Sequence, residues 1–446
     1  MEDEVSNVSQ KTKTIASSVT VDANNSEWKK SMESIFKSEE LYPVKTVKEY
    51  ISTVTDLVNL KEQDSQMILY RGENQAFPTI LPGIYRDPAF VRHESSLLTE
   101  MRSLQPDFFA QELPFISTLA LLQHHGLPTR ALDLTGNALI ALFFACQEAP
   151  SGLKKDNTTG SVLLFVADSQ SLKKSEDEST VYTDRQLIIE QKNVENGTES
   201  QKIQHKASLK SAISDSVAIV ATLARFSARK QTDFYEAFES AIANENELKE
   251  KLDTIGANTH TSLENEYNSF FKEFDKLCEK NIKEIRKNFN NENCVKDLSR
   301  EIRRTVPSFT NQDIDPLDLY RDMMVHLDQT DPRILRQDGY LLLTGNTFSA
   351  GRIGYDTAKY RIKKRNKNPM DKIIKEINMR IKKMRLMVEK KGGRSNKMKP
   401  IRIIVNKDDK KKIIDELSLL GISDGTVYPD TDHKANTVAN KIKNLH

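Results

Sequence analysis

The densest group of chemically versatile side chains lies between Gln123 and Thr135. This stretch holds two adjacent histidines, an arginine, an aspartate and two threonines between apolar segments. Buried polar groups are tolerated when they satisfy one another or face a ligand. The stretch therefore predicts either a binding site or an internal network that pairs Arg130 with Asp133. Neighbouring side chains on a helix point about 100° apart, which disfavours joint metal binding by the two histidines, and we expect no metal site.

A second suggestive group is Tyr70-Arg71-Gly72, which follows the apolar residues 67–69. We expect a short strand that stops at Arg71 and leaves its guanidinium at the edge of a sheet. A guanidinium binds phosphate or carboxylate oxygens through paired hydrogen bonds, and glycine lets the backbone approach a ligand closely. The pattern predicts an anion contact, and its alternative is a surface arginine beside a turn glycine.

Several common catalytic signatures are missing from the sequence. It holds no GxxxxGK[ST] phosphate loop, no GxGxxG after a strand, no GxSxG nucleophile turn and no HExxH helix. The cysteines, Cys146, Cys278 and Cys294, share no CxxC spacing, which disfavours a disulfide scaffold and a zinc site. The commonest NTPase, dehydrogenase, hydrolase and zinc-protease mechanisms are therefore excluded.

The charge of the chain is balanced overall. There are 66 Lys+Arg against 64 Asp+Glu, a net charge of +2, so only local charge can indicate a partner. The N-terminus is acidic with no apolar segment after it, and the longest apolar runs are too short to span a bilayer. We expect a cytoplasmic protein without a membrane partner.

The elements that would position these residues alternate between helices and strands. Apolar spacing predicts helices over 47–60, 94–104, 114–125, 137–148 and 409–420, and strands over 67–70, 161–167 and 401–405. Gly421 is expected to end the last helix. This alternation predicts an α+β protein with a mixed α/β core.

Composition divides the chain into four parts. Residues 1–26 are expected to be a disordered tail, residues 42–168 and 329–446 the two halves of the core, and residues 170–328 a large inserted α-helical subdomain. Within the last part, residues 361–399 are strongly basic with one apolar stripe. That pattern predicts a basic amphipathic helix.

Taken together, these motifs resemble the FRG domain, a family named for a Phe/Tyr-Arg-Gly motif. The resemblance rests on Tyr70-Arg71-Gly72, on ILPGIYR from Ile80 to Arg86, and above all on QHHGLPTR from Gln123 to Arg130 followed by Leu132-Asp133 and Thr135. Later blocks keep the family order, with RILRQDG from Arg333 to Gly339, Gly421-Ile422, and VYPDTD from Val427 to Asp432. Three positions carry an apolar residue that differs from the one common in the family, namely Ala131, Leu134 and Leu341.

The resemblance implies a function. FRG domains occur in bacterial and phage-related genomes, so a defence or toxin-type effector is implied. A distant ADP-ribosyltransferase-like core is also implied, with a pocket for NAD or another nucleotide, NAD being a substrate. In that class an Arg or His on one strand holds NAD, a Ser or Thr on a second braces the site, and a late Glu or Gln faces the reacting ribose. Arg71, Thr135 and Gln337 stand in that order here.

The same resemblance supplies the remaining candidate residues. Because Gln337 carries no charge, a carboxylate such as Glu73 or Asp133 would have to stabilise the ribosyl cation. The catalytic candidates are Arg71, His125, Asp133, Thr135 and Gln337, and the cofactor-binding candidates are Arg71, Gly72, Thr129 and Arg130.

Two other functions stay open. The basic segment 361–399 would contact the phosphates of a nucleic-acid target, or it is a solvated helix that packs on the core. In a third interpretation the core recognises a ligand without turnover, and the stripe Phe270, Phe271 and Phe274 binds a protein partner. The alternative is that this stripe is buried inside the insertion.

Overall fold

The structure is a computed structural model. It describes residues 25–59, 66–109, 115–148, 159–168, 215–257, 263–307, 309, 313–326, 332–353, 369–389 and 398–428. No helix within these ranges is long and apolar enough to cross a bilayer.

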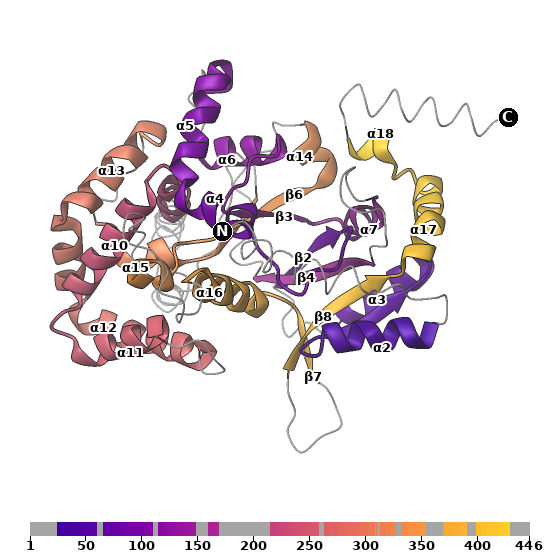
Figure 1. Cartoon of the computed structure of the whole chain (residues 1–446), viewed down its shortest axis with the longest axis horizontal. Helices are drawn as coiled ribbons and strands as arrows, with labels where there is room; N and C mark the ends of the chain where they lie inside the picture. Colours follow the sequence, from indigo (N-terminus) through magenta and orange to yellow (C-terminus); the bar gives the residue numbers. More distant parts are fainter. Residues whose placement is uncertain are drawn as a thin grey trace, which may run out of the picture.

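An eight-stranded sheet organises the fold (Figure 1). Its strands are β1 (Glu40–Val44), β2 (Gln66–Glu73), β3 (Ala131–Thr135), β4 (Gly160–Asp168), β5 (Met323–His326), β6 (Gly339–Leu343), β7 (Met387–Glu389) and β8 (Met398–Val405). Seven follow the order β1-β8-β4-β2-β3-β6-β5, and β7 pairs with β8. β1 runs parallel to β8, and the other strand pairs of the described chain are antiparallel. β2 therefore lies in the middle of a mixed sheet.

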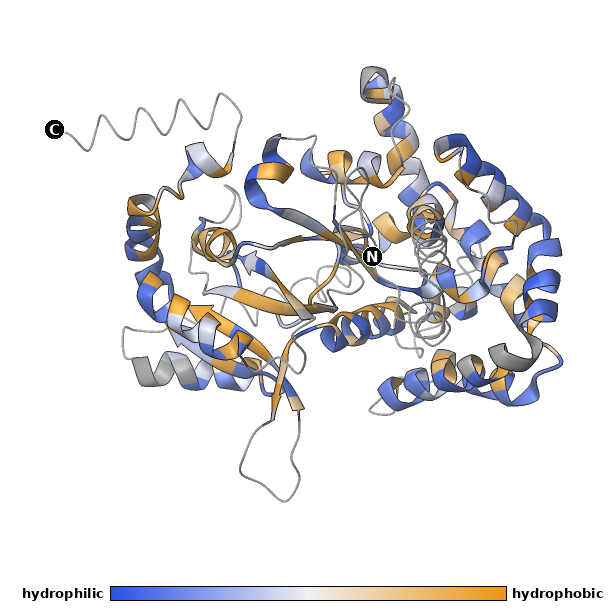
Figure 2. Ribbon diagram, turned by 180° about the vertical axis from the view of Figure 1, so that it is seen from behind, coloured by the Kyte–Doolittle hydropathy of each residue, from blue (hydrophilic) through white to orange (hydrophobic). Residues whose placement is uncertain are grey.

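Helices cover both faces of this sheet. One face packs against α3 (Val47–Val58), α7 (Ala138–Cys146) and α17 (Lys407–Leu419). The opposite face packs against α2 (Asn25–Ile35), α4 (Pro88–Arg92) and α16 (Pro369–Lys383). Successive strand residues alternate between the two cores, as the twofold repeat of a strand requires. Figure 2 shows hydrophobic strands between helices whose outer sides are hydrophilic.

The packing of α7 explains two glycines of the sheet. A β-carbon at Gly72 would lie 1.9 Å from the carbonyl oxygen of Ala141, and one at Gly160 would lie 2.1 Å from that of Ala145. Only glycine lets the helix backbone come this close to β2 and β4. The glycine of the Tyr-Arg-Gly motif therefore serves helix packing.

Between β4 and β5 the chain forms a helical unit. Helical residues 215–223 share one core with α10 (Ala228–Ala241), α11 (Asn246–Ala257), α12 (Leu263–Asn291) and α13 (Asn293–Thr305). Phe348 of α15 (Phe348–Ile353) and Tyr320 of η3 (Pro316–Tyr320) enter the same core and stack with ring centroids 4.2 Å apart. Phe348, which follows β6 in the chain, thus completes the core of the helical unit from outside it.

The expected α+β class with an added helical unit is confirmed. The predicted helices lie close to their expected positions, and Gly421, which follows the C-cap residue Leu420 of α17, adopts φ 81°. Two boundaries differ from those we expected. α2 begins at Asn25, and β5 lies inside the stretch 170–328 yet belongs to the sheet.

Two expectations about local structure are wrong. β2 continues through Arg71 to Glu73, because β4 pairs with it along its whole length. Residues 361–399 do not form one helix, since α16 ends at Lys383 and β7 begins at Met387. Of the two alternatives for the phenylalanine stripe, burial inside the insertion is confirmed, because Phe270 and Phe274 are fully buried and Phe271 packs against the same core.

Candidate functional site

The central feature of the candidate site is the junction of β2 and β3. β2 pairs with β4 over eight residues, but its ladder with β3 holds the single pair Tyr70 and Thr135. Beyond that pair, Arg71 Nη1 donates to the carbonyl oxygen of Asp133 at 2.9 Å. A side chain thus takes over a bond that a backbone amide would make in a longer ladder.

Two arginines meet at this junction. The Arg71 side chain is 14% exposed, and its Nε donates to Glu73 Oε1 at 3.1 Å. Arg86, the last residue of η1 (Gly83–Arg86), reaches solvent and donates from Nε to the carbonyl oxygen of Leu81 at 3.2 Å. Partial burial and then the Arg71 charge lower the pKa of Arg86, while Glu73 and Asp133 raise it. The four charged groups therefore lie within electrostatic range of one another.

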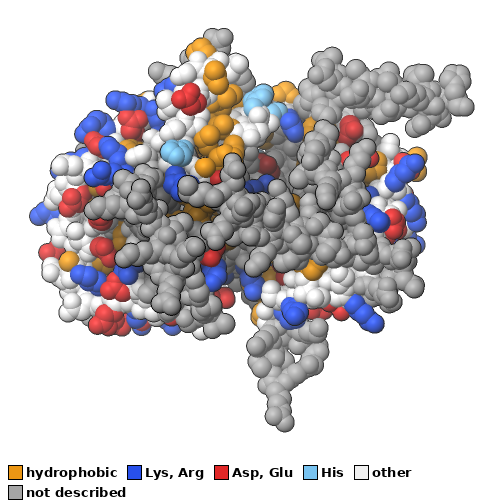
Figure 3. Space-filling view, viewed as in Figure 1, with side chains coloured by type: hydrophobic (Ala, Val, Ile, Leu, Met, Phe, Trp, Pro, Cys, Tyr) orange, Lys and Arg blue, Asp and Glu red, His pale blue; other side chains and the backbone are white. Residues whose placement is uncertain are grey.

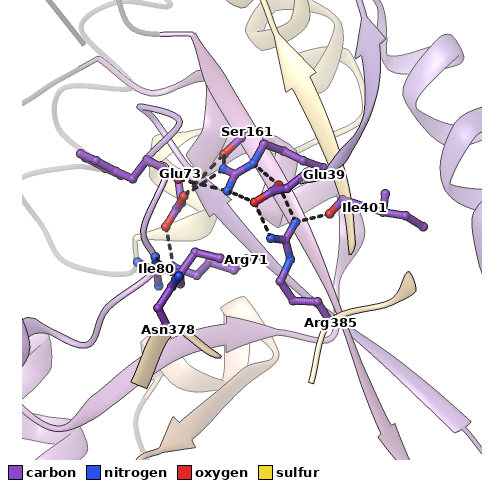
Figure 4. A network of polar contacts seen from close by, with 10 residues as sticks. Glu39, Arg71, Glu73, Ile80, Ser161, Asn378, Arg385 and Ile401 are labelled. Atoms are coloured by element: carbon purple, nitrogen blue, oxygen red, sulfur yellow. Dashed lines mark hydrogen bonds and ion pairs between the residues drawn. The ribbon is translucent and has the colours of Figure 1, made fainter. Parts of the chain in front are cut away.

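Glu73 joins Arg71 to a deeper charged network (Figure 4). Glu73 Oε2 lies 3.7 Å from Arg402 Nη1, and Arg402 Nε donates to Glu39 Oε2 at 2.7 Å. Glu39 Oε1 also accepts from Arg385 Nη1 at 2.9 Å. Burial raises the pKa of Glu39, but the charges and hydrogen bonds of Arg402 and Arg385 outweigh it and lower the pKa to about 2. The ion pair of Glu73 with Arg402 links β2, which carries Arg71, to β8. The link is expected to be rigid, because buried charges persist only when they are paired.

Asp133 presents its side chain on the other face of β3. Successive side chains of a strand point to opposite faces. Leu132 and Leu134 pack in the core that contains Leu69, so Asp133 between them, the one exposed residue of β3, faces away from that core. Gln123 Nε2 donates to Asp133 Oδ1 at 2.6 Å, and Gln123 Oε1 accepts from Thr129 Oγ1. Asp133 is thus an exposed carboxylate held by an amide, on the strand whose backbone Arg71 contacts.

Arg130 has a structural role. Its side chain is 1% exposed, its Nε donates to Glu94 Oε1 at 2.9 Å, and its Nη2 also contacts Glu94. Gln231 of α10 joins this pair by accepting from Arg130 Nη2 at 3.3 Å and donating to Glu94 Oε2 at 3.3 Å. Arg130 therefore ties α5 (Glu94–Leu104) to the helical unit. An internal network is formed, as one of the two alternatives predicted, but its acidic partner is Glu94 and not Asp133.

Thr135 and Gln337 lie beside one another but make backbone contacts. Thr135 Oγ1 donates to the carbonyl oxygen of Gln337 at 2.5 Å and accepts from Asn137 N at 3.0 Å. Gln337 Nε2 donates to the carbonyl oxygen of Val427 at 3.4 Å. These bonds fasten α14 (Pro332–Gln337) between the end of β3 and α18 (Asp424–Val427).

The histidines lie at the end of α6 (Phe115–His124). His124 Nε2 lies 3.0 Å from Arg333 Nη1, and the Arg333 guanidinium lies 4.6 Å from the ring centroid of Tyr428. His125 is exposed before Gly126, whose φ is 87°. No group of three or more His, Cys, Asp or Glu in the described ranges could hold a metal ion.

The structure brings together part of the expected site. Arg71 contacts the backbone of Asp133 at the junction of β2 and β3, whereas Gly72 faces α7. Gln123 links Thr129 to the Asp133 side chain on the other face of the sheet. Sequence reasoning did not select Arg86, although it lies in the ILPGIYR block. It also missed Glu94 and Glu39, whose arginine partners are distant in sequence and give no local signal.

The basic segment 361–399 uses its described arginines internally. Arg380 Nε donates to Asp322 Oδ2 at 2.8 Å, and Arg385 pairs with Glu39. Lys383 Nζ donates to Asn268 Oδ1 at 2.6 Å. These contacts favour a packed helix over a nucleic-acid surface at α16.

Comparison with known proteins identifies the family. Residues 66–153 match the family model of the FRG domain. The matched stretch begins with β2 and includes the Tyr-Arg-Gly motif, the QHHGLPTR block and α7. The chain therefore contains an FRG domain over these residues. No curated protein and no solved structure matches it.

Proposed function

We propose that this FRG-domain protein binds NAD or a related dinucleotide at the junction of β2 and β3 and acts as an ADP-ribosyltransferase-like effector. The observation that carries the proposal is the pair of neighbouring cations Arg71 and Arg86 at one short strand pairing, where Arg71 contacts the backbone of Asp133. Two cations suit a pyrophosphate, which carries two negative charges. The carboxylate supplies the charge that Gln337 lacks.

The proposed roles follow from the two faces of β3. Arg71 and Arg86 bind the pyrophosphate on the Leu132 and Leu134 side, and Glu73 positions Arg71 through its 3.1 Å bond. Asp133, held by Gln123, lies on the other side beside the reacting ribose. Gly72 does not bind the ligand in this proposal, because the backbone of α7 occupies the space around it.

In the proposed reaction the bond between nicotinamide and ribose C1′ breaks, and its electron pair leaves with nicotinamide. The Asp133 carboxylate stabilises the resulting oxocarbenium ion. A nucleophile, either water or a group on a protein or nucleic-acid target, then forms a bond to C1′ and loses its proton. A defence or toxin-type role rests on the family resemblance alone, and a target that accepts ADP-ribose would fit it.

The test is incubation of the purified protein with NAD, labelled in its adenylate group, and cell extract. Nicotinamide release and label in the protein or nucleic-acid fraction are both followed. Asp133→Asn keeps the size of the side chain and should lower turnover about 100-fold. Asp56→Asn, an exposed change on α3, serves as the matched control and should leave turnover unchanged.

Each result decides between functions. Turnover lost in Asp133→Asn alone supports the transferase or hydrolase function, and the labelled fraction identifies the acceptor. Binding of NAD without turnover in the wild type supports the non-catalytic sensing function. Absence of both binding and turnover contradicts the proposal.

A further inference from the structure

The outer side of α13 and the adjoining start of α10 carry a concentrated positive charge. Residues 225–230 and 293–305 contain seven Lys or Arg against two Asp or Glu, a net charge of +5, whereas the whole chain carries +2. Figure 3 shows Lys and Arg side chains, with Asp and Glu among them, along the edge of the molecule where α13 lies. We call this surface the α13 basic face, made of Arg225, Arg229, Lys230, Lys296, Arg300, Arg303 and Arg304.

The spacing of the charges forms a row. Lys296, Arg300 and Arg304 follow one another at four-residue intervals, which places them about 6 Å apart along the helix axis. The Arg300 and Arg304 side chains are 69% and 64% exposed and pair with Asp297 and Glu301 on the same helix. Surface ion pairs of this kind are weak, so both guanidinium groups stay accessible to another anion. The apolar residues Val295, Leu298 and Ile302 are buried on the opposite side, which fixes the row toward solvent.

Arg225, which precedes α10, and Arg102 of α5 extend this face beyond α13. The Arg225 guanidinium lies 5.3 Å from the ring centroid of Phe115, and Glu301 Oε2 lies 3.3 Å from its Nη2. Burial lowers the pKa of Arg225, Glu301 raises it, and both Arg102 of α5 and Arg304 of α13 lower it, so these cations lie within electrostatic range. Arginines from three elements therefore converge beside an aromatic ring.

We propose that the α13 basic face binds the phosphate backbone of a nucleic acid. A row of cations, one per helical turn, matches a polymer of phosphates better than a single phosphate. A membrane-surface helix would also expose large apolar side chains. None of the described residues from 225 to 305 is an exposed large hydrophobic, so an aqueous polyanion is the better fit. This inference is independent of the proposed NAD chemistry.

The test measures fluorescence anisotropy of a labelled RNA strand, a DNA strand and a DNA duplex at low and moderate salt. The combined change Arg300→Gln, Arg303→Gln and Arg304→Gln should weaken binding about tenfold or more, and should reduce the salt slope by about 2 for single strands and about 3 for duplex DNA. Lys407→Gln, Lys411→Gln and Lys412→Gln on the exposed side of α17 remove equal charge elsewhere and should have little effect.

A reciprocal variant keeps the test decisive if the triple variant unfolds. Glu301→Gln removes an acid from within the face and should tighten binding. The inference is overturned if the wild type binds no nucleic acid at low salt, or if the α17 variant weakens binding equally. Binding only to vesicles of anionic lipid would also overturn it. Comparison of the three probes tells whether RNA or DNA is preferred.

Discussion

At the residue scale, the arginine and the glycine of the Tyr-Arg-Gly motif have different roles. Gly72 makes room for the backbone of α7, whereas Arg71 spans the gap to β3 and keeps part of its guanidinium exposed. Arg86, from a separate block, lies within electrostatic range of it. The chemistry of the site therefore depends on side chains that the short motif does not contain.

The buried Glu39 predicts a specific pH dependence. Its pKa is lowered from 4.5 to about 2 in the folded state, so its stabilising contribution is complete above pH 4.5 and is lost as the pH falls toward 2. At pH 3 the loss is on the order of 2 kcal/mol. Urea unfolding of the wild type at pH 6 and pH 3 should show this loss.

Variants separate Glu39 from the other carboxylates. Glu39→Gln should be less stable at neutral pH, because Arg385 and Arg402 lose their partner, and should show a weaker drop between pH 6 and pH 3. Glu33→Gln, an exposed change on α2, should keep the wild-type drop. An unchanged pH profile in Glu39→Gln would show that its pKa is not lowered.

At the element scale, the spacing of apolar residues predicted the helices well but did not predict the ion-pair partners of the buried arginines. The helix over 94–104 was predicted at its observed bounds, and Gly421 was recognised as the end of α17. β3 was missed because its five residues include the charged Asp133. The partners of Arg130 and Arg402 lie far away in sequence, so a pattern in a single sequence could not reveal them.

The close contact of α7 with β2 leads to a prediction about Gly72. Gly72→Ala should lower the free energy of unfolding by about 1–3 kcal/mol or more, because its β-carbon would collide with the Ala141 carbonyl. Urea unfolding measures this change. Gly126→Asn is the control, since nothing lies within 4 Å of a β-carbon there and Asn tolerates positive φ. A stable Gly72→Ala that loses ligand binding would instead mean that the glycine faces the ligand.

At the scale of the whole molecule, buried contacts connect the helical unit to the rest of the described chain, and we expect the helical unit and the sheet to unfold together. Phe348 and Tyr320 are fully buried in the core of the helical unit, although they lie outside its helices. Gln231 of α10 joins the buried pair of Arg130 and Glu94. Contacts of this kind couple the unfolding of the two parts.

The single tryptophan provides a test of this coupling. Trp28 in α2 is 3% exposed and its Nε1 donates to Thr159 Oγ1 at 3.0 Å, so its fluorescence reports on the sheet side. Far-ultraviolet circular dichroism reports on the helices, and the two midpoints in urea should coincide. Phe348→Ala should lower both midpoints together, because it should lower the free energy of unfolding by about 3–5 kcal/mol. Loss of helix before any change in fluorescence would show that the parts unfold separately.

The most direct test of the central claim is calorimetric titration of NAD and of nicotinamide riboside, which lacks the pyrophosphate, into the wild type and Arg86→Gln. Arg92→Gln, an exposed change on α4, is the matched control. We expect Arg86→Gln to weaken NAD binding about tenfold, the loss of one charge-assisted contact, and to leave nicotinamide riboside unaffected. Equal NAD affinity in the wild type and Arg86→Gln would contradict a pyrophosphate site at the junction of β2 and β3.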